Sequence, residues 1–269
     1  MTIIIISAVL ALLLLLVDSN LRIVYSEHEI EFDNLPENFD GFRIVQLSDL
    51  HEKVFGKGNK YLISRVSEAN PDLIAITGDV VDKEGENEYV YDLVTELSKI
   101  APVYYVSGNH EWASKVAREI FTVVTDAGGT VLRNRYVTLE RDGERIVIAG
   151  IDDPAGPYDM KTPAELSSEI ESNEGDVFSV LLAHRNNPNT YSGLCNDVIL
   201  CGHAHGGVIR LPFIGGLLGT NRKLFPKYTE GVYDLGGNYM VVSRGLGSGI
   251  IIPRFLNNPD ISILILKSA

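Results

Sequence analysis

Each of five short apolar runs in this chain is followed directly by a segment rich in Asp, Asn or His. The runs begin at Phe42, Leu73, Val103, Val177 and Val198, and their composition predicts buried strands. The segments that follow them are Ser-Asp-Leu-His at 48–51, Gly-Asp-Val-Val-Asp at 78–82, Gly-Asn-His-Glu at 108–111, His184, and Gly-His-Ala-His at 202–205. Loops that follow neighbouring strands of an open α/β sheet meet beyond the carboxyl ends of the strands. The sequence therefore predicts an α/β fold that brings these five segments together.

The remaining pattern alternates further strands with amphipathic helices. We expect helices at 59–70, 86–99, 115–127 and 163–171, and further strands at 23–32, 131–139 and 145–149. The Asp142-Gly143 pair between the last two strands is typical of a hairpin turn. Early alternation of strand and helix, followed by hairpins, indicates α/β layers around a mixed sheet.

Residue spacing within the polar segments favours a shared site. Asp49 and His51 are two residues apart, as are His203 and His205, so both side chains of each pair can point the same way from extended backbone. In three segments a glycine stands just before the candidate ligand, where it allows a tight turn. Five of the six histidines in the chain fall in these segments.

The donor types in these segments predict a centre with two metal ions. Imidazole, carboxylate and amide groups without thiolate suit Mn²⁺, Fe or Zn²⁺ better than Ca²⁺. Three carboxylate or amide groups and four imidazoles would meet if the five strands share an edge. Such a set is too large for one tetrahedral zinc and suits two metals that share a carboxylate.

Other motifs in the chain give weaker support to a different chemistry. His110-Glu111 begins like the helix of a zinc protease, but Ser114 stands where that motif needs its second His. Gly-Lys-Gly at 56–58 lacks the Gly-Lys-Ser/Thr of a phosphate-binding loop. The nucleophile elbow of serine hydrolases is matched only loosely at 245–249. The metal interpretation therefore explains the polar segments best.

The N-terminus carries an apolar run over residues 3–17 that only Ser7 interrupts. With the two residues before it, the run reaches the lower limit of about 17 residues for a membrane-spanning helix. A cleaved signal peptide is the rival interpretation, and a buried core helix would need polar positions at helical spacing, which the run lacks. Because no Lys or Arg precedes the run and residues 16–18 are not a small-x-small cleavage site, we expect an uncleaved anchor over 1–20 and a soluble domain over 21–269.

Composition limits the partners. The chain has 23 Lys and Arg against 36 Asp and Glu, a formal net charge of −13 that would repel nucleic acid, so none is expected. Two cysteines provide neither a disulfide framework nor a Cys-based zinc site. Arg22 is the one cationic side chain that flanks the apolar run, so the flanking charges favour neither membrane orientation.

The ordered set Asp-x-His, Gly-Asp-x-x-Asp, Gly-Asn-His-Glu, a later His and Gly-His-x-His resembles the calcineurin-like metallophosphoesterases. The five blocks run in this order from Asp49 to His205. Phe-Pro-Lys-Tyr at 225–228 and Val-Ser-Arg-Gly-Leu-Gly at 242–247 are similar to the bacterial membrane-associated phosphodiesterases of the YaeI and YkuE type. The resemblance implies a four-layer α/β/β/α sandwich with a mixed β-sheet core, preceded by the N-terminal membrane helix, at the bacterial cell membrane.

Carried over residue by residue, the resemblance implies a dinuclear metal centre. It gives one metal to Asp49, His51 and His205 and the other to Asn109, His184 and His203, with Asp79 as the bridge. Mn²⁺ is the expected metal, with Fe, Zn²⁺ or a mixed pair as alternatives. His110 is implied as the catalytic residue that protonates or stabilises the leaving oxygen. Asp82 and Glu111 are candidates to orient the imidazoles, although a turn role explains Asp82 better.

The resemblance implies a phosphoesterase, with a diester or pyrophosphate as substrate. Two cations lower the pKa of a bridging water, and the resulting hydroxide attacks phosphorus in line. Protonated His110 then donates to the departing oxygen. The alternative is a non-catalytic, membrane-anchored binding or scaffold protein that keeps the fold; such a protein is expected to lack a ligand, and none is missing.

The substrate depends on the loops around the site. Residues 211–218 are apolar and glycine-rich and follow the last ligand segment, so we expect a buried hairpin there, with a lipid-facing rim as the alternative. A membrane-anchored enzyme of this class suits a lipid-linked phosphodiester or pyrophosphate, such as a UDP-diacylglucosamine-like nucleotide–sugar lipid. Cell-wall phosphate polymers are another substrate class. The expected partners are therefore a phosphate ester and a membrane.

Overall fold

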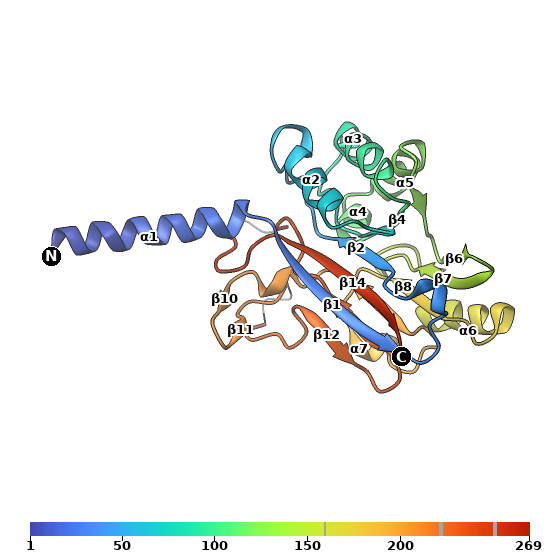
Figure 1. The fold of residues 1–269 in the computed structure, drawn as a ribbon. Coiled ribbons are helices and arrows are strands. Elements are labelled where there is room, and N and C mark those ends of the chain that lie inside the picture. Colours follow the sequence, from blue (N-terminus) through green and yellow to red (C-terminus); the bar gives the residue numbers. More distant parts are fainter. Residues whose placement is uncertain (159, 221–222, 250–251) are drawn as a thin grey trace.

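Two β-sheets packed face to face form the centre of the fold (Figure 1). The computed structural model describes residues 1–158, 160–220, 223–249 and 252–269, and within these residues each of the two sheets has six strands. Helices pack on the outer face of each sheet. The result is the four-layer α/β/β/α arrangement that the sequence predicts.

The first sheet has the strand order β1-β14-β2-β3-β4-β5. Its strands are β1 (Val24–Phe32), β14 (Asp260–Ser268), β2 (Arg43–Leu47), β3 (Leu73–Thr77), β4 (Val103–Val106) and β5 (Thr130–Val131). Neighbouring strands run parallel except β14 and β2, which are antiparallel. The carboxyl ends of β2, β3 and β4 therefore lie at one edge, as the sequence predicts.

The second sheet has the strand order β12-β13-β9-β8-β7-β6. Its strands are β12 (Gly231–Asp234), β13 (Tyr239–Val242), β9 (Val198–Cys201), β8 (Ser179–Leu182), β7 (Glu144–Gly150) and β6 (Arg135–Arg141). The four central strands are parallel, and the two outer strands are antiparallel to their neighbours.

Apolar side chains on alternate positions of the strands build the cores. In β3, Leu73 and Ala75 face the core between the two sheets, whereas Ile74 and Ile76 face the helices. This period of two with both faces buried is typical of a parallel strand covered on both sides. The core between the sheets is continued from the second sheet by residues such as Val180.

The helices cover the sheets with apolar stripes at helical spacing. The longer helices of the domain are α2 (Lys60–Glu68), α3 (Asn87–Ser98) and α5 (Ala117–Asp126) on the first sheet and α6 (Pro163–Glu174) on the second, and the shorter elements are α4 (Asn109–Ala113), α7 (Pro188–Tyr191), η1 (Glu37–Phe39), η2 (Lys57–Asn59) and η3 (His205–Gly207). In α3, Val90, Leu93, Val94 and Leu97 form the buried stripe. Thr162 caps α6, whose first residue is a proline.

Residues 131–149 contain the expected hairpin turn but not the expected single strand before it. The Asp142-Gly143 turn is confirmed: both residues have positive φ, 49° and 84°, and join β6 to β7. The expected single strand at 131–139 is wrong, because β5 ends the first sheet and β6 begins at the edge of the second. Asn134, with a φ of 53°, turns the chain between the two sheets.

The apolar N-terminal run forms α1 (Thr2–Leu21), a helix that projects from the domain (Figure 1). It is 20 residues long, and an 18-residue stretch of it has a mean hydropathy of 2.6 and is only 6% buried. By length and composition it can cross a membrane, a property that a signal sequence shares.

A short hairpin, β10 (Arg210–Leu211) and β11 (Gly215–Gly216), follows the last ligand segment. The expected burial of residues 211–218 is wrong at the hairpin tip, where Phe213 is fully exposed and Ile214 is 61% exposed. Within residues 211–218 only Gly216, at the base of the hairpin, is buried, where it lies against Gly207.

Candidate metal centre

The five polar segments meet where the carboxyl ends of strands from both sheets come together. Asp49 follows β2, Asp79 follows β3, and Asn109 is the first residue of α4 after β4. His184 follows β8. His203 and His205 follow β9. The Asp49 carboxylate accepts the backbone N–H of His203 at 3.1 Å, which joins the edges of the two sheets.

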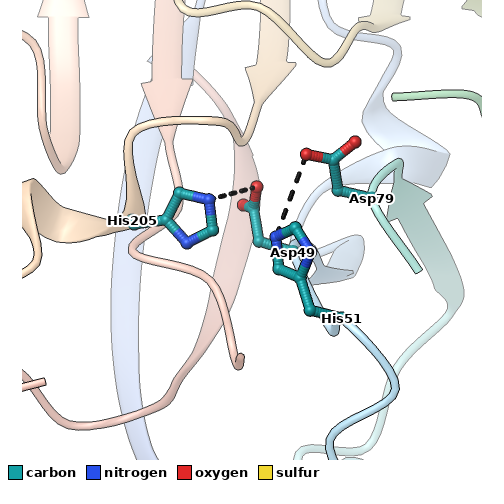
Figure 2. A group of neighbouring side chains, drawn as sticks. All are labelled: Asp49, His51, Asp79 and His205. Carbon is teal, nitrogen blue, oxygen red and sulfur yellow. Dashed lines mark ion pairs between the residues drawn. The ribbon is translucent and has the colours of Figure 1, made fainter. Parts of the chain in front are cut away.

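Asp49, His51, Asp79 and His205 form a first buried group of donors (Figure 2). His205 Nε2 lies 3.5 Å from Asp49 Oδ1, and His51 Nε2 lies 3.9 Å from Asp79 Oδ2. One ligand atom from each of the four side chains lies within 4.8 Å of the others. The group can therefore surround a single cation.

Asp79, His184 and His203 form a second group that shares Asp79 with the first. His184 Nε2 lies 3.2 Å from Asp79 Oδ2, 3.2 Å from Asn109 Oδ1 and 3.1 Å from His203 Nδ1. The structure thus brings together all seven residues that the sequence predicts as ligands.

Several of these residues hold a strained backbone. Asp49, His51, Asp79, His203 and His205 have φ values between 47° and 67°, the left-handed region that side chains with a Cβ rarely adopt. Each such residue costs about 1–2 kcal/mol relative to its ordinary conformation. Strain of this kind collects at functional sites, where the surrounding structure enforces it.

Two glycines make room for the carboxylates. A Cβ at Gly108 would lie 2.2 Å from Asp79 Oδ1, and a Cβ at Gly202 would lie 2.7 Å from Asp49 Oδ2. A side chain at Gly108 would displace the Asp79 carboxylate, and one at Gly202 would clash first with Ser48 Oγ, 1.8 Å from the Cβ position. The sequence predicts a tight turn at each glycine that precedes a ligand, but of these three glycines only Gly78 has a positive φ, 84°. Gly108, with a φ of −102°, and Gly202 are required for space instead.

The donor set fits a divalent metal. Among the described residues, His51 Nε2 is a buried atom without a hydrogen-bond partner, and Asp79 Oδ2 makes no hydrogen bond apart from its ion pair with His184. Both atoms face the centre of the first group. Buried polar atoms normally have a partner, and leaving one without costs about 1–3 kcal/mol. A cation would satisfy both atoms, and imidazole with carboxylate is a donor set for Mn²⁺, Fe or Zn²⁺.

Asp82 orients two imidazoles. Its Oδ1 accepts from Nδ1 of His51 at 2.5 Å and from Nδ1 of His110 at 2.7 Å. The expectation that Asp82 is mainly a turn residue is therefore wrong. The hydrogen bond with Asp82 raises the pKa of His110, against the opposing effect of burial.

Glu111 acts on the backbone of the site instead. Its carboxylate accepts the backbone N–H groups of Val80 at 2.6 Å, Gly108 at 2.9 Å and Asp79 at 3.2 Å. Burial and the Asp79 charge raise the pKa of Glu111. The residue therefore fixes the loops that carry two ligands, and it does not orient an imidazole as the sequence suggests.

Burial and neighbouring charges shift the protonation of the centre. Burial opposes ionisation of Asp79, but the His184 imidazole holds the pKa of Asp79 well below its usual range. Burial would lower the pKa of His184, yet Asp79 raises it to about 10. Burial lowers the pKa of His205 to about 4, so this imidazole is neutral at pH 7 and ready to bind a cation.

Sequence reasoning missed Arg185 and Asp153. Arg185 donates to the buried Asp153 carboxylate from Nε at 2.7 Å and from Nη2 at 3.2 Å, and its Nη1 lies 3.1 Å from His203 Nε2. Both residues could have been found by the rule that identified the ligands, namely a polar residue soon after a strand. Asp153 follows β7 closely, and Arg185 directly follows the ligand His184.

A cavity of about 1030 Å³ opens beside the second donor group. His184, Arg185 and His203 form part of its wall. The rest includes cationic residues such as Lys161 and apolar residues such as Phe225. The cavity can therefore place an organic group next to the donors.

Comparison with known proteins agrees with this arrangement. Residues 42–207 match the profile of the calcineurin-like phosphoesterases. The chain is 34% identical over 254 residues to an uncharacterized metallophosphoesterase, YkuE, of Bacillus subtilis (strain 168), covering 90% of this chain and 85% of that protein. It is 27% identical to phosphodiesterase YaeI of Escherichia coli (strain K12), covering 82% and 80%. A transmembrane protein with metallophosphoesterase domain from Danio rerio is also 27% identical, covering 90% of this chain and 56% of that protein. The chain belongs to the calcineurin-like phosphoesterase family.

Proposed function

We propose that this chain is a metal-dependent phosphodiesterase, held at a membrane by residues 1–20 and active through a domain formed by residues 21–269. Family membership supports a phosphoester hydrolase. The observation that carries the proposal is the pair of donor groups that share Asp79. The names of the YaeI and Danio rerio relatives support diester cleavage and membrane attachment.

The proposed ligands form two sets that share one carboxylate. Asp49, His51, Asp79 and His205 would hold one cation, and Asp79, Asn109, His184 and His203 the other. Oxygen and imidazole donors favour Mn²⁺, with Fe, Zn²⁺ or a mixed pair as alternatives. When bound, such cations supply Lewis-acid activation of water and charge stabilisation at the phosphoryl group.

His110 is the proposed general acid. Its Nδ1 donates to Asp82, and its Nε2 faces the site, 3.9 Å from Asp79 Oδ2. The raised pKa of His110 keeps the imidazole protonated to higher pH. Nε2–H is therefore placed to give its proton to the departing oxygen of the substrate.

Arg185 is the proposed phosphate-binding residue. If Nδ1 of His203 faces a cation, Nε2 of that ring carries the hydrogen and can no longer accept from Arg185. Asp153 occupies the other side of the guanidinium, so Nη1 is held toward the site without an acceptor among the residues that the structure describes. A non-bridging phosphoryl oxygen would fill that place.

The size and lining of the cavity favour a diester over a monoester. A volume of about 1030 Å³ leaves room for organic groups on both sides of phosphorus. Apolar Leu224 and Phe225 lie in the wall together with cationic Lys161 and Lys227. This mixture suits a lipid-linked phosphodiester or pyrophosphate, such as a UDP-diacylglucosamine-like nucleotide–sugar lipid.

The test is turnover by the full chain in detergent with added Mn²⁺. We expect bis(4-nitrophenyl) phosphate to be cleaved with a kcat/KM at least about tenfold above that for 4-nitrophenyl phosphate. Asp49→Asn should abolish cleavage, whereas Asp126→Asn, at an exposed position at the end of α5, should not. Folded, Mn²⁺-loaded protein that cleaves neither ester would overturn the proposal and favour a binding or scaffold protein.

A further inference from the structure

The tip of the β10–β11 hairpin, which follows the last ligand segment in the chain, is an exposed apolar surface. The tip sequence Leu-Pro-Phe-Ile at 211–214 contains no charged residue. Phe213 is fully exposed and has a φ of 67°, a conformation that is unusual for a bulky side chain. An aromatic and an aliphatic side chain held outward in this way indicate a contact surface.

We infer that this hairpin tip is a second membrane contact, which inserts Phe213 and Ile214 into the interfacial region of the bilayer that holds α1. The inference rests on the proposed anchoring of residues 1–20. The proposed partner is the lipid surface itself, not a second copy of the chain or a protein ligand.

Hydrogen bonds connect the end of α1 to the segment that supports the hairpin. Ser19 Oγ accepts the backbone N–H of Leu256 at 2.9 Å. The Asn20 side chain donates to the carbonyl of Arg254 at 2.9 Å and accepts its N–H at 3.2 Å. The last turn of the helix is therefore fixed to residues 254–256.

The same segment pairs with the residues that enter β10. Ile209 and Phe255 form a bridge, and the Arg210 N–H donates to the Phe255 carbonyl at 2.9 Å. At the hairpin base the Arg210 side chain donates to the Gly206 carbonyl at 2.9 Å and pairs with Glu230. Helix end and hairpin are thus parts of one hydrogen-bonded unit.

The placement agrees with a common membrane surface. In Figure 1, β10 and β11 lie on the side of the domain from which α1 projects. A bilayer that surrounds α1 up to its last turn therefore reaches the hairpin on the same side. Phe and Ile are well suited to the boundary between lipid headgroups and acyl chains, where apolar side chains insert by about 5–10 Å.

The hairpin also links this surface to the site. It follows His205 directly, and the chain after it continues to Gly219 and Thr220, which line the cavity. Contact with lipid at the tip would therefore hold the cavity close to the bilayer. This position suits the lipid-linked substrate class proposed above.

The test uses the full chain in phosphatidylcholine–phosphatidylglycerol vesicles, with or without bromine on the acyl chains. Phe213→Trp adds one fluorophore to a chain whose single native tryptophan can be subtracted with the unaltered protein. Glu140→Trp is the matched control, because it is exposed on β6, on the side away from α1 in Figure 1. Ile214→Trp repeats the test should the first variant fold poorly.

We expect the Phe213→Trp emission to be blue-shifted and quenched at least twofold by brominated lipid, while the Glu140→Trp emission is neither. Vesicle flotation and turnover of the soluble aryl diester are measured in parallel. Protein that floats and turns over but shows no lipid quenching at residues 213 and 214 would overturn the hairpin contact alone. Protein that does not float would overturn the membrane anchor and the hairpin contact together. Unaltered protein that shows lipid quenching at residue 213 but no diester turnover would support the hairpin contact and overturn only the proposed function. A blue shift without lipid that grows with protein concentration would assign the tip to a second copy instead.

Discussion

At the scale of single residues, Asp82 determines the protonation of His110. The hydrogen bond from His110 Nδ1 to Asp82 raises the pKa of His110, so the imidazolium persists to higher pH. If the imidazolium is the general acid, kcat falls as pH rises through this pKa. Asp82→Asn removes the negative charge and lowers the pKa of His110, so the alkaline limb of the kcat profile should move to lower pH. The measurement is kcat against pH for a diester with an alkyl alcohol as leaving group.

The matched control is Asp92→Asn, at an exposed position of α3, which should leave the profile unchanged. His110→Gln should remove the alkaline limb and reduce kcat by about 10²–10⁴-fold, the usual contribution of a general acid. An alkaline limb that is the same in all of these proteins would exclude His110 from proton transfer.

Arg185 offers a second residue-scale prediction. Lysine keeps the charge but cannot hold Asp153 and a phosphoryl oxygen with one planar group. Arg185→Lys should therefore lower kcat/KM for the aryl diester by about 10–100-fold, the loss expected for a hydrogen bond to a charged group. Steady-state kinetics checks this against Arg118→Lys, an exposed position on α5. Equal kcat/KM values in the two variants would remove Arg185 from phosphate binding.

The ligand residues could be predicted from sequence because each follows a strand and their order is fixed by the chain. Asp153 follows β7 in the same manner, but the sequence shows β7 only as the second strand of a hairpin with β6. That β7 also runs parallel to β8, so that their carboxyl ends lie at the same edge, is seen only in the structure. The role of Asp82 could not be predicted either. It depends on the approach of His51 and His110 from different loops.

At the level of loops and turns, Gly108 is a position where a side chain would clash although the backbone conformation is open to any residue. Its φ of −102° is open to any residue, but a Cβ there would lie 2.2 Å from Asp79 Oδ1. Gly108→Ala should therefore displace the carboxylate and abolish diester turnover, with a stability loss of about 1–3 kcal/mol. Turnover and urea unfolding are the measurements.

Gly143→Ala is the control, because at this position the backbone conformation disfavours a side chain although there is space for one. Gly143 has a φ of 84°, and among the described residues no atom beyond its chain neighbours lies within 4 Å of the place that a Cβ would take, so alanine there adds strain without a clash. It should destabilise the chain by about 1 kcal/mol and leave turnover intact. Full turnover in Gly108→Ala would show that the loop adapts and that the close approach is not required.

The strands were predictable where they are short, apolar and followed by a turn. β3, β4 and β9 begin at the expected residues 73, 103 and 198, and β2 begins one residue later than expected, at Arg43. The break between β5 and β6 was not predictable from apolar content, because the residues on both sides of Asn134 continue the strand pattern. Only the separation of two sheets in space shows where one strand ends.

At the scale of the whole molecule, α1 is attached to the domain by its last turn. The helix is almost entirely exposed, and the contacts described above come from Ser19 and Asn20. Deletion of residues 2–17 should therefore shift the thermal midpoint by less than about 2 °C and keep diester turnover, while vesicle flotation is lost. A large fall in the midpoint would show that the apolar run belongs to the core of the domain.

The pairing of β1 with β14 illustrates what the sequence could not predict. Val24 pairs with Asp260, and the two strands run parallel along nine residues at the edge of the first sheet. Contacts between residues so distant in sequence leave no local pattern, because either strand could pair with any exposed sheet edge. The pairing begins shortly after the end of α1 and adds β1 as the outer strand of the first sheet.

The central claim is that one carboxylate, Asp79, joins two cation sites. The most direct measurement is the number of Mn²⁺ ions bound per chain after equilibrium dialysis, determined by elemental analysis on folded protein. We expect two ions per chain for the unaltered protein and for Asp126→Asn, and at most one for Asp79→Asn, together with loss of diester turnover. Two tightly bound ions and full turnover in Asp79→Asn would contradict this claim.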